Sequence, residues 1–416
     1  MTTSASGTLS NTYATLSTNG VYLSTNKIVT PSNTESTNSK LIQYIPNSMC
    51  HTTWVEQYFM NRPDFNRTSV CEIPAGNGIS MDKIFLKITL PDLSNFTGMS
   101  YNNFCTYNLI KSIKLVIGQS TIFEYNPDLL YVIDKVNGDL EKIKKLCQPR
   151  KSIYYPIDLT KIVSDIQQTT GEKLELLQPG LPLVFLDTDK IKLYCEFGSI
   201  FDIVETNQDV LSSEIIQQLK NLQLTEATVC VNYFQTYPKC FNTKSESKSV
   251  CNTTLTKSIN QKFSCWVGYG TIKKANDLAP EFQRHEKFHI DIDTRIKHIS
   301  EMIVYAKTCP TTEITSILLQ ADGQDLNEAS LSLTNNLFYN FDKPGMLNND
   351  PNIHGYMLNW HNANFKTLDV RVTITTGSVP SDIKLYFMFK VHDMLTYVDG
   401  MCKMPIDTKF FVDHNS

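Results

Sequence analysis

The chain has 416 residues, of which 41% are hydrophobic, and a net charge of −4. This length exceeds one ordinary core and suits two domains of roughly 200 residues each, while the slightly acidic balance gives no basic field for wrapping nucleic acid. No stretch approaches the ~20 apolar residues that span a bilayer, and the N-terminus lacks the basic start and apolar block of a secretory signal. We therefore expect a protein that is made and kept in the cytosol.

Residues 1–44 are predicted to be an N-terminal arm. The segment is rich in Ser, Thr and Asn, carries few charges and has only a short apolar patch at Val21–Leu23. Such a composition cannot build a core by itself. We expect the arm to order against another surface or to remain a flexible tail.

Residues 45–240 are predicted to be the first domain, and their pattern is mainly that of β-strands. The predicted strands lie at 80–90, 109–117, 121–125, 153–159, 181–186, 190–197 and 228–234. Helical spacing of apolar residues interrupts them at 139–147 and 210–222. The basic cluster Lys142, Lys144 and Lys145 on the first helix is interpreted as a solvent-exposed helix face.

Residues 241–284 are polar and irregular, with one or two strands near 263–268, and are predicted to connect two domains. The second domain is predicted at 285–416. Its predicted strands lie at 287–292, 301–306, 314–321, 338–341, 367–375 and 383–391, with a further apolar position at Leu331. Many short strands with long polar connections favour two antiparallel sandwiches over alternating strands and helices.

The segment 109–120 returns in altered form at 313–325. In both, Ser-Ile opens an alternating strand and a Gly-Gln turn follows. The offset from Ile113 to Ile317 is 317 − 113 = 204 residues, close to half of the chain. A strand and turn repeated at half-length indicate two copies of one domain.

Strand order extends this correspondence. It pairs 190–197 with 367–375, and 228–234 with 383–391. The string Ile-Lys-Leu-Tyr-x-x-Phe occurs in the first and last of these four segments, which do not correspond. We interpret that identity as coincidence and take the order of strands as the better guide.

The segment from His285 to His289 has the His-Glu-x-x-His spacing that binds zinc on a helix, with Glu286 as the base. From residue 288 onward, however, the sequence alternates with period two, which places His289 in a strand. Residues four apart on a strand have Cα atoms roughly 13 Å apart, too far to chelate one ion. We therefore predict no metal site here.

Two groups of carboxylates suggest acid–base chemistry, Asp187, Asp189 and Glu196 in one, Asp291 and Asp293 in the other. Carboxylates two apart on a strand share a face and can act in catalysis if a cleft raises one pKa, but a solvated strand or turn explains the same spacing. The sequence has no Gly-rich phosphate loop and no Gly-x-Ser-x-Gly elbow. We predict no catalytic residue, no metal and no cofactor.

Cysteines and aromatic residues are read as packing groups. Eleven cysteines are scattered without a Cys-x-x-Cys pair, and those in strand patterns, such as Cys195, Cys230 and Cys265, are expected to be reduced and buried. Phe and Tyr in strands mostly fill sandwich cores. Aromatic residues in the connections are expected to fill either the core or subunit contacts, and these are Tyr101, Phe104, Tyr125, Phe338, Tyr339 and Tyr356.

Six segments between residues 80 and 405 resemble a known family through their order. In the first half they are a strand with an Ile-Gly-Gln turn (109–119), a Leu-Pro-Leu block before a strand (181–193) and a closing strand (231–236). In the second half they are the opening strands of the second domain (288–305), an Ala-Asp-Gly stretch with a later aromatic turn (321–341) and a last strand (383–401). This order resembles the double jelly-roll major capsid proteins of the large nucleocytoplasmic DNA viruses. The turn after Ile117 keeps one glycine where the family has two, so we expect a divergent member.

The resemblance implies an all-β chain of two consecutive eight-stranded jelly rolls, with short helices in the connecting loops. It implies a structural protein without catalysis, namely a major capsid protein whose homotrimers form pseudo-hexagonal capsomers that tile an icosahedral shell. The implied partners are neighbouring capsomers, minor capsid or penton proteins and, through other proteins, an internal viral membrane, with no direct nucleic-acid contact. The implied location is the virion, after assembly in the host cytoplasm.

Two alternatives remain open. A transient viral assembly scaffold protein of related fold would form a similar lattice and be abundant only in immature particles. A carbohydrate-binding or hydrolytic β-sandwich protein would be stabilised by a sugar or a metal, and a monomer would favour it.

Overall fold

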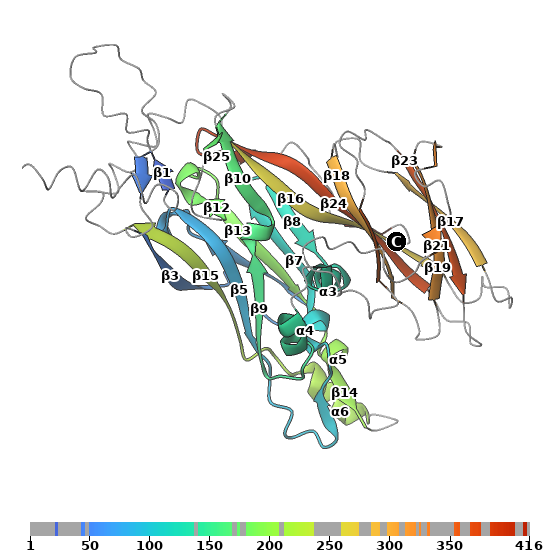
Figure 1. Ribbon diagram of the computed structural model, residues 1–416. Helices are drawn as coiled ribbons and strands as arrows, with labels where there is room; N and C mark the ends of the chain where they lie inside the picture. The colour runs from blue at the N-terminus through green and yellow to red at the C-terminus, as the bar shows by residue number, and fades with distance from the viewer. Residues whose placement is uncertain are drawn as a thin grey trace, which may run out of the picture.

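The described part of the chain forms two lobes that are built almost entirely of strands (Figure 1). In the computed structural model, the described residues are 21–23, 43–45, 50–136, 140–168, 173–174, 180–207, 212–236, 259–273, 284–291, 298–307, 313–321, 324–325, 331–332, 353–357, 367–375, 383–403 and 411–413. None of the helices among these residues has the length and apolar character needed to cross a membrane.

The first lobe is a sandwich of two antiparallel sheets. Its strands are β3 (Cys50–Tyr58), β4 (Thr68–Ile73), β5 (Ser80–Thr89), β7 (Ile110–Ile117), β8 (Ser120–Tyr125), β9 (Ser152–Asp158), β12 (Leu181–Pro182), β13 (Ile191–Phe197) and β15 (Glu226–Thr236). One sheet has the order β12-β5-β15-β3, with β9 also paired to β5, and the other has the order β4-β13-β7-β8. Along β5 and β13 buried and more exposed residues alternate, as a strand with one face on a core requires.

The order of pairing is that of a jelly roll. Leaving the two-residue β12 aside, the lobe has eight main strands in chain order. The first, eighth, third and sixth make one sheet, and the second, seventh, fourth and fifth make the other.

The second lobe repeats this topology. Its strands are β16 (Ile259–Lys273), β17 (Arg284–Asp291), β18 (His298–Lys307), β19 (Glu313–Ala321), β20 (Gln324–Asp325), β21 (Leu331–Ser332), β22 (Ile353–Met357), β23 (Thr367–Thr375) and β24 (Ile383–Val398). One sheet contains the order β16-β24-β18-β22, and the other has β17-β23-β19 with β20 and β21 paired to β19. The predicted all-β double jelly roll is therefore confirmed.

The internal repeat predicted from the sequence falls on corresponding strands. The echoing segments form β7 and β19, each the fourth main strand of its lobe. The seventh strands, β13 and β23, and the eighth strands, β15 and β24, correspond as the strand order predicted. The repeated Ile-Lys-Leu-Tyr string lies on strands of different rank, β13 and β24, so it is not part of the repeat.

Short helices occupy the connections of the first lobe. They are α2 (Cys105–Leu109), α3 (Pro127–Val136), α4 (Leu140–Leu146), α5 (Ile200–Ile203) and α6 (Ser213–Lys220). Helices α4 and α6 confirm the two predicted helical segments. The sequence reading missed α3, although Asn126 accepts a hydrogen bond from the Leu129 amide at 2.8 Å and Pro127 opens the helix, a common N-terminal pair.

The strand predicted over 181–186 is wrong beyond its second residue. Only Leu181 and Pro182 pair with β5, and Leu183–Phe185 form a 3₁₀ turn. Proline has no amide hydrogen to donate, so it weakens a ladder at the point where the chain turns away. The apolar run is buried all the same, because Leu183 and Phe185 pack into the core.

Main-chain pairing joins the two lobes. The hairpin β10 (Val163–Gln168) and β11 (Lys173–Leu174) follows β9 in the first lobe, and β10 pairs with β16 of the second. At the far end of the chain, β25 (Met401–Lys403) pairs with β24 and β26 (Phe411–Asp413) pairs with β16. The first sheet of the second lobe is therefore extended by a strand from the first lobe.

Several sequence predictions concern the chain ends and the connection. Within the predicted arm the structure describes β1 (Val21–Leu23) and β2 (Gln43–Ile45), which pair with each other. Within the predicted connection 241–284 it describes β16, which pairs with β24 along its whole length. The predicted aromatic residues Phe338 and Tyr339 lie outside the described residues.

Candidate functional site

The His-Glu-x-x-His segment lies in a strand. Both His285 and His289 belong to β17, which pairs with β23 from Arg284 to Asp291. The strand assignment that led us to predict no zinc site at this position is confirmed. Among the described residues, no group of three or more His, Cys, Asp or Glu side chains is arranged to bind a metal ion.

The first predicted group of carboxylates is dispersed by the fold. The Asp189 carboxylate accepts a hydrogen bond from the Cys402 amide at 2.7 Å, and the Asp187 amide donates to the Gly400 carbonyl at 3.1 Å. Glu196, in β13, forms an ion pair with Lys111 at 3.0 Å. Asp189 and the Asp187 backbone thus attach the loop before β13 to β24–β25 of the second lobe, which is a structural role.

The contact with Asp189 explains why the repeated Gly-Gln turn has a glycine at position 118. Gly118 has φ +58° and lies against the Asp189 carboxylate, so a Cβ atom there would collide with it. The residue is therefore required both for its backbone conformation and for the close approach. Asp291 lies in β17, and Asp293 lies outside the described residues.

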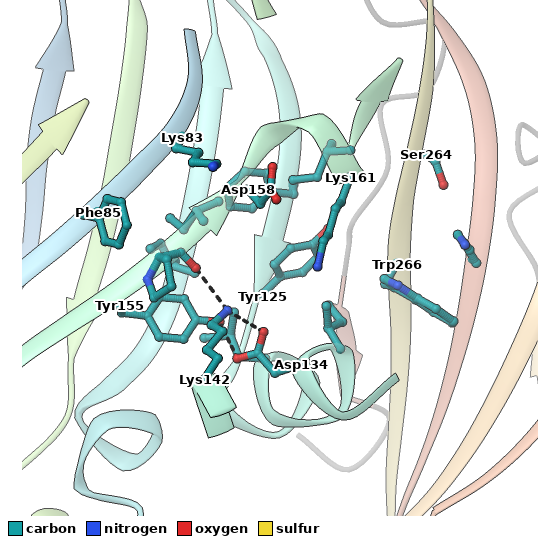
Figure 2. A pocket seen from close by; sticks show the side chains of 18 residues that line it. Lys83, Phe85, Tyr125, Asp134, Lys142, Tyr155, Asp158, Lys161, Ser264 and Trp266 are labelled. Carbon is teal, nitrogen blue, oxygen red and sulfur yellow. Dashed lines mark hydrogen bonds and ion pairs between the residues drawn. The ribbon is translucent and has the colours of Figure 1, made fainter. Parts of the chain in front are cut away.

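The junction between the lobes contains a cavity of about 290 Å³ (Figure 2). Its wall combines β5, β7, β8, β9, α3 and α4 of the first lobe with β16 and β24 of the second. The lining includes Tyr125, Asp134, Lys142, Tyr155, Trp266 and Lys390. This junction is the candidate functional site, because it fixes how one lobe lies against the other.

A buried ion pair forms one side of the junction. The Lys142 ammonium lies 2.6 Å from the Asp134 carboxylate and donates to the Pro156 carbonyl at 3.1 Å. Two phenols, Tyr107 at 2.9 Å and Tyr155 at 3.3 Å, also donate to Asp134. Figure 2 shows Lys142 and Tyr155 converging on Asp134. Together with the two phenols, the ion pair connects α3 and α4 to α2 and β9.

The prediction that Lys142 belongs to a solvent-exposed face is wrong. Its side chain is half-buried and lies 4.7 Å from the Tyr155 ring centroid, while Lys144 and Lys145 are exposed as expected. The Asp134 carboxylate and the Tyr155 ring hold the Lys142 side chain against the first lobe, whereas Lys144 and Lys145 remain exposed. Burial, and then the Asp134 charge, raise the pKa of Tyr107 above its usual range, so its phenol stays a neutral donor.

Aromatic residues form the other side of the junction. Tyr125 and Trp266 are each 6% exposed, and the Lys390 ammonium lies 5.9 Å from the Trp266 ring centroid. Burial raises the pKa of Tyr125 well above its usual value, although a hydrogen bond from the Trp266 backbone opposes the shift. Tyr125 therefore fills the contact between the lobes.

The other connecting aromatic residues have different places. Tyr101 is buried and donates to the Pro91 carbonyl at 2.5 Å, so it belongs to the core. Phe104 is 44% exposed, and Tyr356 lies in β22.

The seven cysteines whose side chains the structure describes are free, as the sequence predicted. Cys195 and Cys265 are buried and Cys230 is half-buried. Burial raises the pKa of each of these three thiols.

A known protein family matches the first lobe. A family model described as Major capsid protein N-terminus matches residues 47–236, which contain the first jelly roll from β3 to β15. No curated protein sequence matches the chain. The first lobe matches the major capsid protein family, and the whole chain has the double jelly-roll fold.

Solved structures show the same fold over most of the chain. The crystal structure of PBCV-1 VP54 that was fitted into a reconstruction of the virophage Sputnik has a TM-score of 0.60 at 12% identity, over 86% of this chain and 97% of that chain. The Sputnik virophage structure has a TM-score of 0.52 at 10% identity, over 86% and 89%. The Faustovirus major capsid protein has 0.51 at 7%, over 83% and 90%. At these identities, the likeness shows the fold of this chain, and the sequences have diverged widely.

Proposed function

We propose that this chain is a major capsid protein and that it forms homotrimers, which act as pseudo-hexagonal capsomers of an icosahedral virus shell. The observation that carries the proposal is the repetition of one jelly-roll topology in two lobes of a single chain. Three copies around a threefold axis would present six similar lobes, and a six-lobed ring tiles a shell. A closed ring of this kind follows from identical contacts between successive copies.

The proposed role is structural, and the polar groups at the lobe junction support it. The Asp134–Lys142 pair and its two phenols satisfy one another inside the first lobe, and Asp189 is bound to a backbone amide of β25. The chemistry of these groups is that of orientation and packing. The proposed partners are neighbouring capsomers and minor capsid or penton proteins, with an internal membrane reached through other proteins. The proposed location is the virion, after assembly in the host cytoplasm.

The native mass of the purified full-length protein tests this proposal. A trimer has three times the chain mass of 47.3 kDa. A mass of one chain, above all with stabilisation by added sugar or metal, would instead support the β-sandwich binding protein.

Particle composition separates the capsid protein from the scaffold alternative. The capsid protein should be abundant in purified mature particles. A scaffold would be abundant in immature particles and absent from mature ones.

A further inference from the structure

One outer sheet face of the first lobe carries exposed aromatic side chains. Trp54 is 49% exposed, Tyr58 71% and Tyr154 54%. The strand register places Tyr58 and Tyr154 in one row, because Tyr58 pairs with Thr228, Thr228 with Lys87, and Lys87 with Tyr154. We call the outward surface of β3, β15, β5 and β9 the Trp54 face.

The exposure on β3 follows the alternation of the strand. Trp54 and Tyr58 point outward, whereas Val55 and Phe59 pack against the core of the first lobe. The Trp54 ring lies 5.0 Å from that of Phe85 on β5, so the aromatic residues are contiguous across the sheet. Single exposed apolar residues are ordinary, but a contiguous aromatic patch marks a contact surface.

The second lobe has a tryptophan at the corresponding place. The first strand of each lobe contains the dipeptide Trp-Val, Trp54-Val55 in β3 and Trp266-Val267 in β16. In each lobe this tryptophan pairs with the eighth strand. The duplicated fold therefore provides an internal comparison of the same sheet face in two surroundings.

The two tryptophans differ in burial because of their neighbours. The first lobe covers Trp266, which lines the junction cavity beside Tyr125 and is 6% exposed (Figure 2). In Figure 1, β3 and β15 lie on the side of the first lobe away from the second lobe. Trp54 is consequently left half-exposed, although it occupies the equivalent position.

We infer that the Trp54 face is covered by the second lobe of a neighbouring copy, as the first lobe covers Trp266 within one chain. This inference rests on the proposed homotrimer. Repeating one lobe-to-lobe contact from copy to copy gives a head-to-tail interface, which closes into a ring when the rotation allows. The covering side would be that of β21 and β22, the counterparts of β8 and β9.

The polar residues beside the aromatic patch suit such an interface. Lys87 lies 3.3 Å from Glu56 and 3.7 Å from Glu226 on the same outer face. Thr228 donates to Glu56 at 2.6 Å. An aromatic centre with paired charges nearby is typical of protein–protein interfaces, where tryptophan and tyrosine contribute most of the binding energy.

A charge placed at Trp54 tests the inference. In the full-length protein, Trp54→Glu should reduce the native mass from three chains to one, because a carboxylate would be buried without a partner in the interface. The matched control is Phe201→Glu, since Phe201 is 41% exposed on α5, away from the Trp54 face. The control should keep the mass of three chains. Circular dichroism of both variants should match that of the unaltered protein.

A second variant keeps the test decisive if Trp54→Glu does not fold. Tyr58→Glu alters a more exposed residue on the same face and should also give a single-chain mass. Folded variants of Trp54 or Tyr58 that remain trimeric would overturn the inference and leave the trimer intact. An unaltered protein that is monomeric at all concentrations would instead refute the proposed homotrimer, so the two failures are distinguishable.

Discussion

A buried charge pair such as Asp134–Lys142 is costly to break from one side. The two residues leave water on folding, and their mutual contact, the two phenols and the Pro156 carbonyl offset that loss. Removing one partner strands the other charge in a nonpolar setting. The ion pair also links α3 to α4 at the lobe junction.

We expect Lys142→Met to lower the free energy of unfolding by about 3–5 kcal/mol, because it leaves the Asp134 carboxylate buried without its cation. Denaturant unfolding followed by circular dichroism measures the change. The matched control is Lys144→Met, an exposed position on the same helix, which should shift stability by less than about 0.5 kcal/mol. Adding Asp134→Asn to Lys142→Met should recover part of the loss, and a purely additive double variant would contradict a coupled pair.

Buried thiols make a pH-dependent contribution. Burial, and then the Asp189 carboxylate, raise the pKa of Cys402 to about 12. The unfolded thiol loses its proton near pH 9, whereas the folded thiol keeps it up to about pH 12. In this window the unfolded state binds fewer protons, so stability falls as pH rises.

Removing that thiol should flatten the alkaline side of the stability profile. We expect Cys402→Ala to show a slope of unfolding free energy between pH 9.5 and 11 that is smaller by about 1.4 kcal/mol per pH unit, the value for one proton. Urea unfolding at several pH values measures both proteins. An identical slope in the two would show that Cys402 titrates normally in the folded protein.

At the scale of elements, the lobes are joined by strands that cross from one to the other. Gln261 in β16 donates to the Gly180 carbonyl of the first lobe at 3.0 Å and accepts from the Tyr397 hydroxyl of β24 at 2.7 Å. Because β16 also pairs with β10, the boundary between the lobes is crossed by backbone and side-chain bonds. We propose that this boundary lies between residues 236 and 259, where β15 ends and β16 begins.

We expect Tyr397→Phe to lower the free energy of unfolding by about 1–3 kcal/mol, because the Gln261 carbonyl is then buried without a donor. Tyr194→Phe, at a half-buried tyrosine in β13, is the control and should change stability by less than about 0.5 kcal/mol. Thermal unfolding of both variants provides the comparison. Equal losses in the two would contradict a specific role for the Gln261 contact.

At the scale of the whole molecule, the two lobes cover each other unequally. The first lobe covers the Trp266 side of the second, whereas Trp54, Tyr58 and Tyr154 on its own outer sheet face remain exposed. One chain therefore has two copies of the same kind of sheet face, one covered at Trp266 and one exposed at Trp54. The proposed head-to-tail assembly would use this asymmetry, because the next copy would cover the exposed Trp54 face.

We expect the second lobe to associate nonspecifically when it is expressed without the first, as residues 259–416. Trp266 and Met388, which are buried in the full chain, lie on one sheet face that would become exposed. Binding of an apolar fluorescent dye and size-exclusion chromatography measure this. A monodisperse second lobe that binds no dye would show that its Trp266 side needs no cover.

The sequence by itself determined the class of fold, the duplication and the family resemblance. These depend on period-two alternation, on the order of strands and on the Gly-Gln turn, all of which can be read along the chain. The strand nature of His289 was predicted because alternation excludes a helix at that place. The burial of Lys142, the binding of Asp189 to Cys402 and the difference between Trp54 and Trp266 were decided by the tertiary structure alone. Each depends on which surface meets a side chain from a distant part of the chain, and local sequence patterns carry no record of that neighbour.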